Sequence, residues 1–318
     1  MSTVAQADAA TAAPAAQLDV PVALFIFNRP GPTSRVFAAI VAARPRVLLV
    51  VADGARTHRP DDAARVAAAR AIVDLVDWPC DVRRDFSDRN LGSRRRVSSG
   101  IDWVFTQVDR AIILEDDCVP VPAFFRYCSE MLQLYRDDRR IQSISGSNFA
   151  REEAPAGHYC SNFALMWGWA TWANRWADYC VDPTDAAAVV DRMWSRSPVR
   201  WAYWRRIFAA LASHGMDAWD YQWILTLWRR RTLCIRPTVN LVQNIGFGAE
   251  ATHTTVTDTP LNRMIAVDSP DSFARRVGPV AADCARDAVD ERLWAQIGVR
   301  SVIMMYLPWM RRPAWLRR

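Results

Sequence analysis

Three adjacent carboxylates, Glu115, Asp116 and Asp117, directly follow the apolar residues 111–114 in the stretch DRAIILEDDCVP. Neighbouring negative charges repel one another, and a buried carboxylate without a partner is costly. A hard divalent cation would remove this repulsion, because it binds carboxylate oxygens and keeps positions for water or substrate phosphates. The alternative is a solvated acidic turn, but the apolar run indicates that a buried strand positions the cluster. The sequence therefore predicts a metal or nucleotide site here.

A fourth carboxylate, Asp220, stands among aromatic residues in the stretch AWDYQW, 218–223. Partial burial beside Trp219 and Tyr221 would raise the pKa of its carboxyl toward the range of a general base. The alternative is an acid that caps a helix N-terminus. Asp220 is thus a candidate base that takes a proton from an attacking hydroxyl.

A candidate phosphate site lies in RNLGSRRR, 89–96. Gly92 permits close approach of the backbone, and Arg94 opens the helix that follows, whose N-terminus favours an anion such as a diphosphate. We expect Arg94 to contact phosphate, and Arg95 and Arg96 to face solvent.

The stretch NIGFGAEATH, 244–253, predicts a loop that closes over a bound donor. Gly246 and Gly248 permit backbone conformations that other residues rarely adopt, and a closing loop would exclude water from the reaction. His253 ends the stretch and is a candidate metal or phosphate ligand. A histidine in a loop often has neither role, so this alternative stays open.

The elements that hold these residues alternate along the first 120 residues. Apolar runs predict strands and amphipathic runs predict helices, in the order 20–30, 32–43, 46–56, 61–78, 80–92, 93–108 and 109–120. This alternation predicts a largely parallel sheet with helices on both faces. Ligands bind beyond the carboxyl ends of such strands. The residues that end the strands, Asn28 with Arg29, Asp53 and the acidic cluster, should therefore converge on one edge.

Beyond residue 120 we expect helices at 122–138, 198–215 and 217–231 and a strand at 141–149. The tryptophans of 163–179 cannot share one helix face, so most should be core residues, with Trp169 a candidate for stacking on a sugar ring. The expected organisation is one continuous fold, with a disordered segment at 1–18, a catalytic domain at 19–265 and a C-terminal extension at 266–318.

This ordered series of motifs resembles the GT-A fold glycosyltransferases, in particular the N-acetylglucosaminyltransferase I type and its bacterial relatives. The resemblance covers roughly residues 20–255. ILEDDCVP is similar to that family's form of the Asp-X-Asp signature, and the other motifs are ALFIFNRP, ADG, NLGSRRRVSSGIDWVF, WGWATWANRW, WDYQW and NIGFGAEATH. The resemblance implies an α/β fold of the GT-A (nucleotide-diphospho-sugar transferase) type, with a mixed, mostly parallel sheet flanked by helices.

The resemblance also implies an activity. The chain would be an inverting hexosyl- or N-acetylhexosaminyltransferase that uses Mn²⁺ or Mg²⁺ and a nucleotide-sugar donor, a UDP-sugar first of all. Asp117 would be the direct metal ligand, and Glu115 and Asp116 would face the ribose and metal-bound waters. The acceptor would be a glycan or a lipid-linked molecule in polysaccharide biosynthesis.

The remaining roles follow from the same resemblance. Asp53 would hydrogen-bond the base, unless its Asp-Gly pair is only a turn, and Asn28 and Arg29 would line the nucleoside pocket. Asp220 matches the family's catalytic acid, although the family often has a second acid where Tyr221 stands.

Two rival functions stay open: a sugar nucleotidylyltransferase and a catalytically silent module that binds nucleotide sugars. A nucleotidylyltransferase should carry a Gly-rich loop with arginine and lysine after its first strand. This chain has FNRPGPTS there and contains no lysine.

The net charge of +6 is concentrated at the C-terminus, because 300–318 holds five arginines and no acid. No basic stripe with interleaved aromatics suggests binding to nucleic acid. With Trp309 and Trp315, the basic tail predicts either contact with an anionic membrane surface or packing on the body or a partner subunit.

Seven cysteines without a CxxC pair indicate neither a zinc site nor a redox motif. With no secretory signal and no apolar run of about 18 residues, the expected location is the cytoplasm, at the inner face of the membrane if the tail binds lipid.

Overall fold

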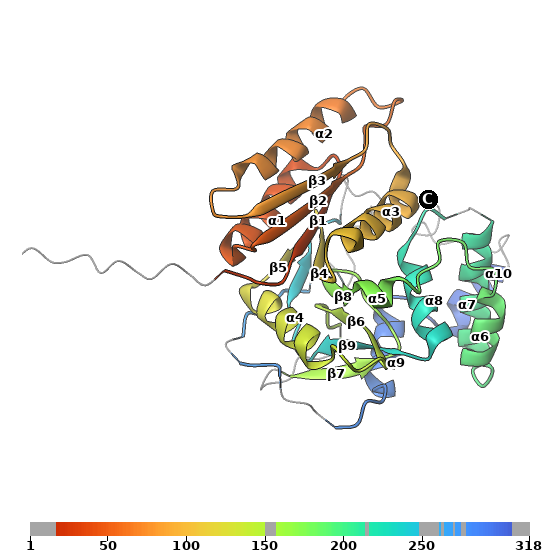
Figure 1. Cartoon of the computed structure of the whole chain (residues 1–318). Coiled ribbons are helices and arrows are strands. Elements are labelled where there is room, and N and C mark those ends of the chain that lie inside the picture. Colours follow the sequence, from red (N-terminus) through yellow and green to blue (C-terminus); the bar gives the residue numbers. More distant parts are fainter. Residues whose placement is uncertain are drawn as a thin grey trace, which may run out of the picture.

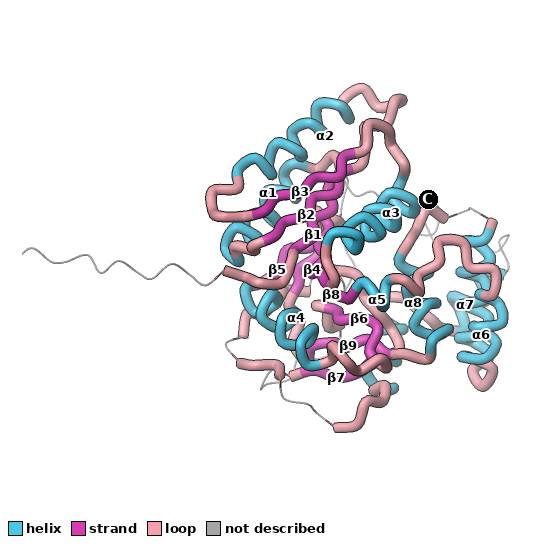
Figure 2. The backbone as a smooth tube through the Cα atoms, viewed as in Figure 1, coloured by secondary structure: helices cyan, strands magenta, loops and turns pink. Residues whose placement is uncertain are grey.

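A computed structural model describes residues 17–149, 157–213, 216–247, 261, 264–269, 271–274 and 278–306. These residues form an eight-stranded sheet in the order β3-β2-β1-β4-β8-β6-β9-β7, with helices on both faces (Figures 1 and 2). Four of the seven strand pairings are parallel and three are antiparallel. The predicted α/β fold class, with a mixed, mostly parallel sheet flanked by helices, is confirmed, and the assignment to the GT-A type stays a prediction.

The first half of the chain forms the parallel part of the sheet. Its strands are β1 (Val22–Ile26), β2 (Val47–Ala52), β3 (Asp81–Phe86) and β4 (Arg110–Glu115). The connections between them contain the helices α1 (Pro30–Ala43), α2 (Asp62–Ala71) with the 3-10 turn Ile72–Leu75, and α3 (Gly92–Gln107). The predicted alternation of strands and helices is confirmed, and the carboxyl ends of the four strands share one edge.

The second half extends the sheet from β4. The antiparallel strand β8 (Trp169–Trp172) pairs with β4, and β6 (Ile141–Ser145), β9 (Leu233–Pro237) and β7 (His158–Ser161) follow. Neither β7 nor β8 is predicted from the sequence, because both are short and β8 lies in the tryptophan-dense stretch. Just after the acidic cluster, β5 (Cys118–Pro120) pairs with β10 (Val242–Asn244). This small sheet brings the start of 244–253 beside Asp117.

The remaining helices pack around this extended sheet. They are α4 (Pro122–Leu134), α5 (Ala173–Trp176), α6 (Ala186–Trp194), α7 (Pro198–Ala212), α8 (Asp220–Arg230), α9 (Cys284–Leu293) and α10 (Val299–Tyr306). None of the helices within the described ranges is long and apolar enough to cross a membrane.

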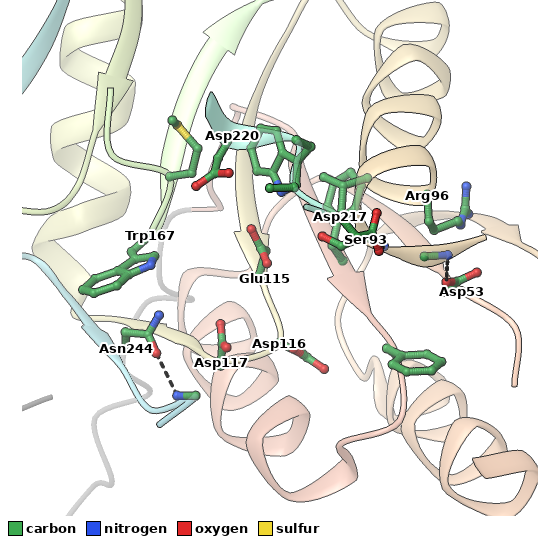
Figure 3. A pocket seen from close by; sticks show the side chains of 18 of the residues that line it. Asp53, Ser93, Arg96, Glu115, Asp116, Asp117, Trp167, Asp217, Asp220 and Asn244 are labelled. Atoms are coloured by element: carbon green, nitrogen blue, oxygen red, sulfur yellow. Dashed lines mark hydrogen bonds between the residues drawn. The ribbon is translucent and has the colours of Figure 1, made fainter. Parts of the chain in front are cut away.

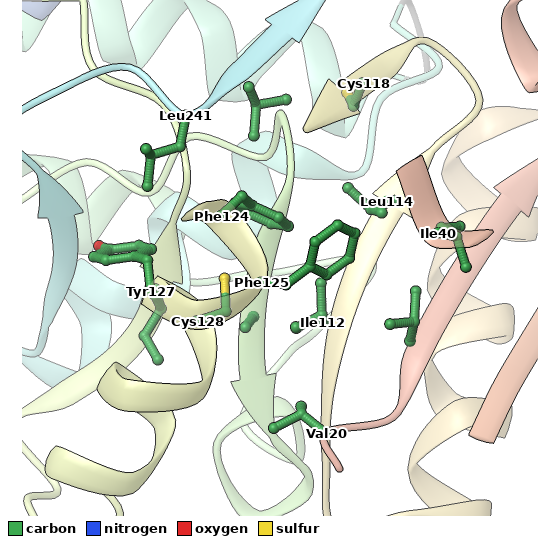
Figure 4. Packing of buried hydrophobic residues seen from close by; sticks show 14 of the residues in the cluster. Val20, Ile40, Ile112, Leu114, Cys118, Phe124, Phe125, Tyr127, Cys128 and Leu241 are labelled. Carbon is green, nitrogen blue, oxygen red and sulfur yellow. The ribbon is translucent and has the colours of Figure 1, made fainter. Parts of the chain in front are cut away.

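Successive side chains of the central strands point to opposite faces of the sheet, so the core is divided into two clusters. Leu24 of β1 belongs to a cluster with α1 and α4, whereas Phe25 belongs to the cluster on the opposite face with α3, α7 and α8. In the first cluster, Phe125 of α4 packs near Ile112 and Leu114 of β4 (Figure 4). Because β4 is buried on both faces, its inner residues form a continuous apolar run.

The C-terminal extension is tied to the sheet by a fully buried ion pair. Arg236 of β9 donates to Asp290 of α9, and both side chains are completely inaccessible to solvent. Arg236 Nε and Nη2 also donate to the Ser147 carbonyl at 3.1 and 3.0 Å. The segment 266–318, expected from the sequence to be an extension, therefore contributes a helix to the body of the protein.

This pair predicts a large effect on stability. Asp290→Asn leaves the Arg236 charge buried without its counter-charge, and we expect a loss of about 3–5 kcal/mol in the free energy of unfolding. The control is Asp74→Asn, because Asp74 pairs with Arg84 at the surface and its carboxylate is mostly exposed. Urea denaturation measures both variants. A loss below about 1 kcal/mol for Asp290→Asn would contradict the assigned role of the pair.

Candidate active site

The three carboxylates of the cluster line one cavity of about 610 Å³ at the carboxyl edge of the sheet (Figure 3). Glu115 is the last residue of β4, and Asp116 and Asp117 form the turn into β5. The buried run 111–114 fixes the direction of β4 between β1 and β8, so the end of this strand has no freedom to turn away from the cavity. The fold thus holds three like charges at one edge.

Arg29 compensates part of this negative charge. It precedes α1, donates to both oxygens of Asp116, and lies 3.0 Å from Asp117 Oδ2. Burial nevertheless raises the pKa of Asp116 to about 6, because the loss of hydration outweighs the opposing effect of Arg29. One guanidinium faces three carboxylates, so the edge of the cavity keeps an excess of negative charge.

Asp220 lies opposite the cluster, in the first turn of α8, and lines the same cavity. Figure 3 shows its carboxylate directed toward Glu115 across the open space. The pKa of Glu115 is raised well above its ordinary value, first by burial and then by the charges of Asp117, Asp116 and Asp220. The fold thus brings Asp220 opposite the acidic cluster, although about a hundred residues separate them in the sequence.

Asp53 also lines the cavity, but its oxygens hold a turn. They accept the backbone N–H groups of Gly54, Leu91 and Gly92 and the side-chain amide of Asn90. Burial raises the pKa of Asp53 despite these hydrogen bonds. The carboxylate thus binds the loop before α3. The hydrogen bond from Asp53 to a nucleotide base, which the resemblance implies, stays a prediction.

Asp217 makes a contact across the cavity edge that no sequence pattern predicts. Its two oxygens accept the Ser93 and Arg94 N–H groups, each at 2.9 Å, at the start of α3. Gly92 has φ +79°, and a Cβ there would lie 2.8 Å from the Asp217 carboxylate. Asp217 therefore links the loop that carries Asp220 to the parallel half of the sheet. No local signal could reveal this contact, because the partners are more than a hundred residues apart.

The arginines at the start of α3 differ from the predictions. Arg94 does not line the cavity formed by the described residues; its side chain donates to the Leu211 and Val181 carbonyls and pairs with Asp182. The predicted contact of Arg94 with phosphate is therefore wrong, because its guanidinium holds these segments together instead. Arg96, which we expected to face solvent, is instead buried and lines the cavity, because the Ala52 carbonyl and Asp85 accept its guanidinium.

Two further predictions are corrected. Asn28 donates to Asp62 Oδ1 at 2.7 Å beside β1 and does not line the cavity that the described residues form, so its amide supports the α2 start rather than a nucleoside pocket. Trp169 is fully buried against Trp176, Trp219 and Trp223, so it cannot stack on a sugar.

The aromatic wall of the cavity comes from other residues. Trp167 packs edge-on against Phe149 and Phe247, with ring centroids 5.1 and 5.7 Å apart, and all three line the cavity. Figure 3 shows Trp167 on the side of Asp117 and Asn244, away from Asp53. The cavity thus has a polar end near α3 and an aromatic end near β10.

The predicted closing loop is described only to residue 247, and Gly248 and His253 lie outside the described residues. Gly246 N donates to Asn244 Oδ1 at 2.7 Å, and the backbone of Gly246 lies against the Asp117 carboxylate, where a Cβ would collide with Oδ2. The start of the loop therefore contacts the cluster directly.

The cluster supplies the kind of ligand that a hard divalent cation binds. Its groups are oxygen donors with excess negative charge, which suits Mg²⁺ or Mn²⁺. No group of three His, Cys, Asp or Glu with the geometry of a metal site occurs within the described part of the chain.

Comparisons with known proteins leave the family open. No protein-family model matches the sequence, and no curated protein matches it. Solved structures with a similar arrangement include a UDP-glucose pyrophosphorylase complexed with UDP-glucose, at 11% identity and a TM-score of 0.34, covering 68% of this chain and 89% of that one. The resemblance to the N-acetylglucosaminyltransferase I type stays a prediction.

The charge on Glu115 predicts a stability that depends on pH. A carboxyl with a raised pKa in the folded state binds its proton more tightly there, so its ionisation opposes folding. The penalty is absent below the ordinary pKa of 4.5 and grows as the pH rises toward the folded value. In EDTA, we therefore expect the free energy of unfolding of Glu115→Gln to exceed that of the wild type by about 1 kcal/mol or more near pH 8. This difference should shrink as the pH falls toward about 5.

Chemical denaturation across this pH range measures the difference. The control is Asp81→Asn, because Asp81 is an exposed residue of β3 that does not line the cavity. A Glu115→Gln variant that is less stable than the wild type at every pH would contradict the electrostatic account.

Proposed function

We propose that the protein is a metal-dependent glycosyltransferase that moves a sugar from a nucleotide-diphosphate donor to an acceptor hydroxyl with inversion at the anomeric carbon. The observation that carries this proposal is the placement of Asp220 and the cluster Glu115–Asp117 on opposite sides of one cavity. One side can bind a cation with the donor diphosphate, and the other offers a base to an incoming hydroxyl.

The donor side is assigned to the cluster and its neighbours. Asp117 and Asp116 would hold Mn²⁺ or Mg²⁺, which stabilises negative charge on a departing diphosphate. Arg29 holds the two aspartates together and adds a fixed positive charge at this side. Arg96 and the turn held by Asp53 line the polar end, where a nucleoside would lie.

The transfer step requires one base. Asp220 accepts the proton of the acceptor hydroxyl while the oxygen bonds to the anomeric carbon and the bond from that carbon to the diphosphate oxygen breaks. The electron pair of the broken bond leaves with the nucleoside diphosphate. Since attack comes from the face opposite the leaving group, the configuration inverts. The placement of Asp220 opposite the cluster supports this direction of attack.

The acceptor side is assigned to the aromatic end. Trp167, Phe149 and Phe247 offer flat apolar surfaces, which suit the CH face of a sugar. A glycan or the sugar of a lipid-linked molecule fits this chemistry. The donor sugar is a hexose or N-acetylhexosamine on UDP by the sequence resemblance alone.

The second candidate function is a sugar nucleotidylyltransferase, whose reaction also needs a nucleotide and a cation. The lack of lysine argues against it, because the loop between β1 and α1 carries a single cation, Arg29. Incubation of a UDP-sugar with Mg²⁺ and pyrophosphate distinguishes the two functions: a nucleotidylyltransferase forms UTP and a sugar phosphate, whereas a glycosyltransferase forms neither.

The base assignment predicts a specific kinetic defect. Asp220→Asn keeps the shape of the side chain but cannot accept the proton, so we expect transfer to fall about 10²- to 10⁴-fold. The affinity of Asp220→Asn for the donor in the presence of Mn²⁺, measured by thermal shift, should differ little from that of the wild type. Turnover is measured with a panel of nucleotide sugars and sugar acceptors.

The matched control is Asp182→Asn, which removes a carboxylate that pairs with Arg94 outside the cavity lining. This variant should retain wild-type turnover. Asp220→Asn with near wild-type transfer would refute Asp220 as the base. A wild type that binds nucleotide sugars but transfers to no acceptor would leave the binding-module function instead.

A further inference from the structure

The C-terminal segment contributes a tryptophan, Trp294, to the cavity. This segment is described to residue 306, so the predicted membrane contact of the basic tail beyond it stays a prediction. Among the described residues beyond 247, only Trp294 lines the cavity. Its ring stacks on that of Tyr221, with centroids 6.0 Å apart and 26° between the planes. Tyr221 also lines the cavity and directly follows the candidate base Asp220 in α8, so the C-terminal segment contacts the turn that carries the base.

The first turn of α8 depends on side-chain packing for its position. Its N-cap residue is Trp219, whose indole cannot accept a hydrogen bond from the first backbone N–H groups as Ser, Thr or Asp would. Helix ends fray where such contacts are lacking. Trp219 packs against Trp169 of β8, with centroids 5.7 Å apart, and Tyr221 packs against Trp294. Asp220 lies between these two aromatic contacts in the sequence, so each contact restrains the backbone from which its carboxylate projects.

Buried carboxylates of α9 hold Trp294 in place. The helix ends directly before Trp294 and carries Asp287 and Glu291, which are 5% and 4% exposed. Asp287 accepts the backbone N–H and the side-chain amide of Asn162 at 3.1 and 2.8 Å, and Glu291 accepts Arg200 Nε of α7 at 2.8 Å. The buried ion pair between β9 and α9 adds a third contact. These partners belong neither to α8 nor to the cavity lining formed by the described residues, so they fix Trp294 independently of the turn on which it packs.

We propose that Trp294 is a positioning residue, which acts through Tyr221 to hold the carboxylate of Asp220 in its orientation across the cavity. Figure 3 shows this carboxylate directed toward Glu115. A base must lie within about 3 Å of the hydroxyl that it deprotonates, and a displacement of about 1 Å can lower the rate about 100-fold. The inference rests on the proposed transfer function. It gives a role in the reaction to a segment that lies outside the resemblance, which ends near residue 255.

Hydrogen exchange of the full chain, followed by mass spectrometry, tests the structural link without a substrate. Trp294→Ala removes the ring that packs on Tyr221, so we expect the backbone amides of 219–226 to exchange at least about tenfold faster than in the wild type. Trp294→Phe keeps an aromatic ring and should restore most of the protection. The matched control is Trp201→Ala, because Trp201 of α7 is 38% exposed and does not line the cavity that the described residues form. This control should leave exchange at 219–226 unchanged.

Kinetics of the same variants test the link to the base. Release of UDP from UDP-glucose, UDP-galactose and UDP-N-acetylglucosamine is measured with Mn²⁺ and with p-nitrophenyl glycosides as acceptors. We expect Trp294→Ala to lower kcat about 10- to 100-fold, with KM for the donor within about twofold of the wild type. Trp294→Phe should recover most of this loss, and Trp201→Ala should keep the wild-type kcat. Because a residue that acts through Asp220 has no effect without it, adding Trp294→Ala to Asp220→Asn should change the residual rate by less than about twofold.

Circular dichroism melting establishes that each variant folds, and Trp294→Leu, which keeps apolar volume, replaces Trp294→Ala if the latter is unfolded at the assay temperature. Three outcomes would overturn the inference and leave the transfer function standing: unchanged exchange at 219–226, a wild-type kcat, or an equal defect in the wild-type and Asp220→Asn backgrounds. The last outcome would make Trp294 a substrate contact instead. A wild type that releases UDP with none of the acceptors would overturn the proposed function and this inference with it.

Discussion

The electrostatic cost of three carboxylates at the end of a buried strand constrains the rest of the site. β4 is fixed between β1 and β8, so Glu115, Asp116 and Asp117 are delivered to the cavity whether or not their charges are balanced. Arg29 offsets part of this charge. Burial first, and the neighbouring carboxylates after it, still raise the pKa values of Glu115 and Asp116. A fold that keeps such a cluster accepts lower stability in the free protein, as functional sites commonly do.

The second half of the chain turns this edge into a closed site. The antiparallel strand β8 continues the sheet, and its Trp169 packs against Trp219 and Trp223 on either side of Asp220 in the sequence. Asp217 then ties the same loop to the start of α3. Asp220 is therefore positioned from two directions, by an aromatic core and by a helix cap. Trp169, which the sequence predicted as a candidate for stacking on a sugar, serves this positioning instead.

The sequence predicts the parallel half well, because strands buried on both faces are continuous apolar runs and the helices between them are amphipathic. The polar side chains at the ends of β2 and β4 could be placed at one edge from topology alone. The failures have a common physical cause, which is dependence on distant partners. Arg96 is buried by the Ala52 carbonyl and Asp85, Arg94 is held by Asp182, and β7 contains His158, whose ring bonds Tyr135 and the Phe273 carbonyl. No local pattern encodes such contacts.

The central claim is that the cluster binds a divalent cation together with a nucleoside diphosphate. The most direct measurement is an electron paramagnetic resonance titration of Mn²⁺ into the wild type and Asp117→Asn, each with and without UDP. The account predicts one Mn²⁺ per chain, bound more tightly when UDP is present because the two ligands are reciprocally coupled, and weakened about tenfold or more by Asp117→Asn. Mn²⁺ binding that neither UDP nor the substitution changes would contradict it.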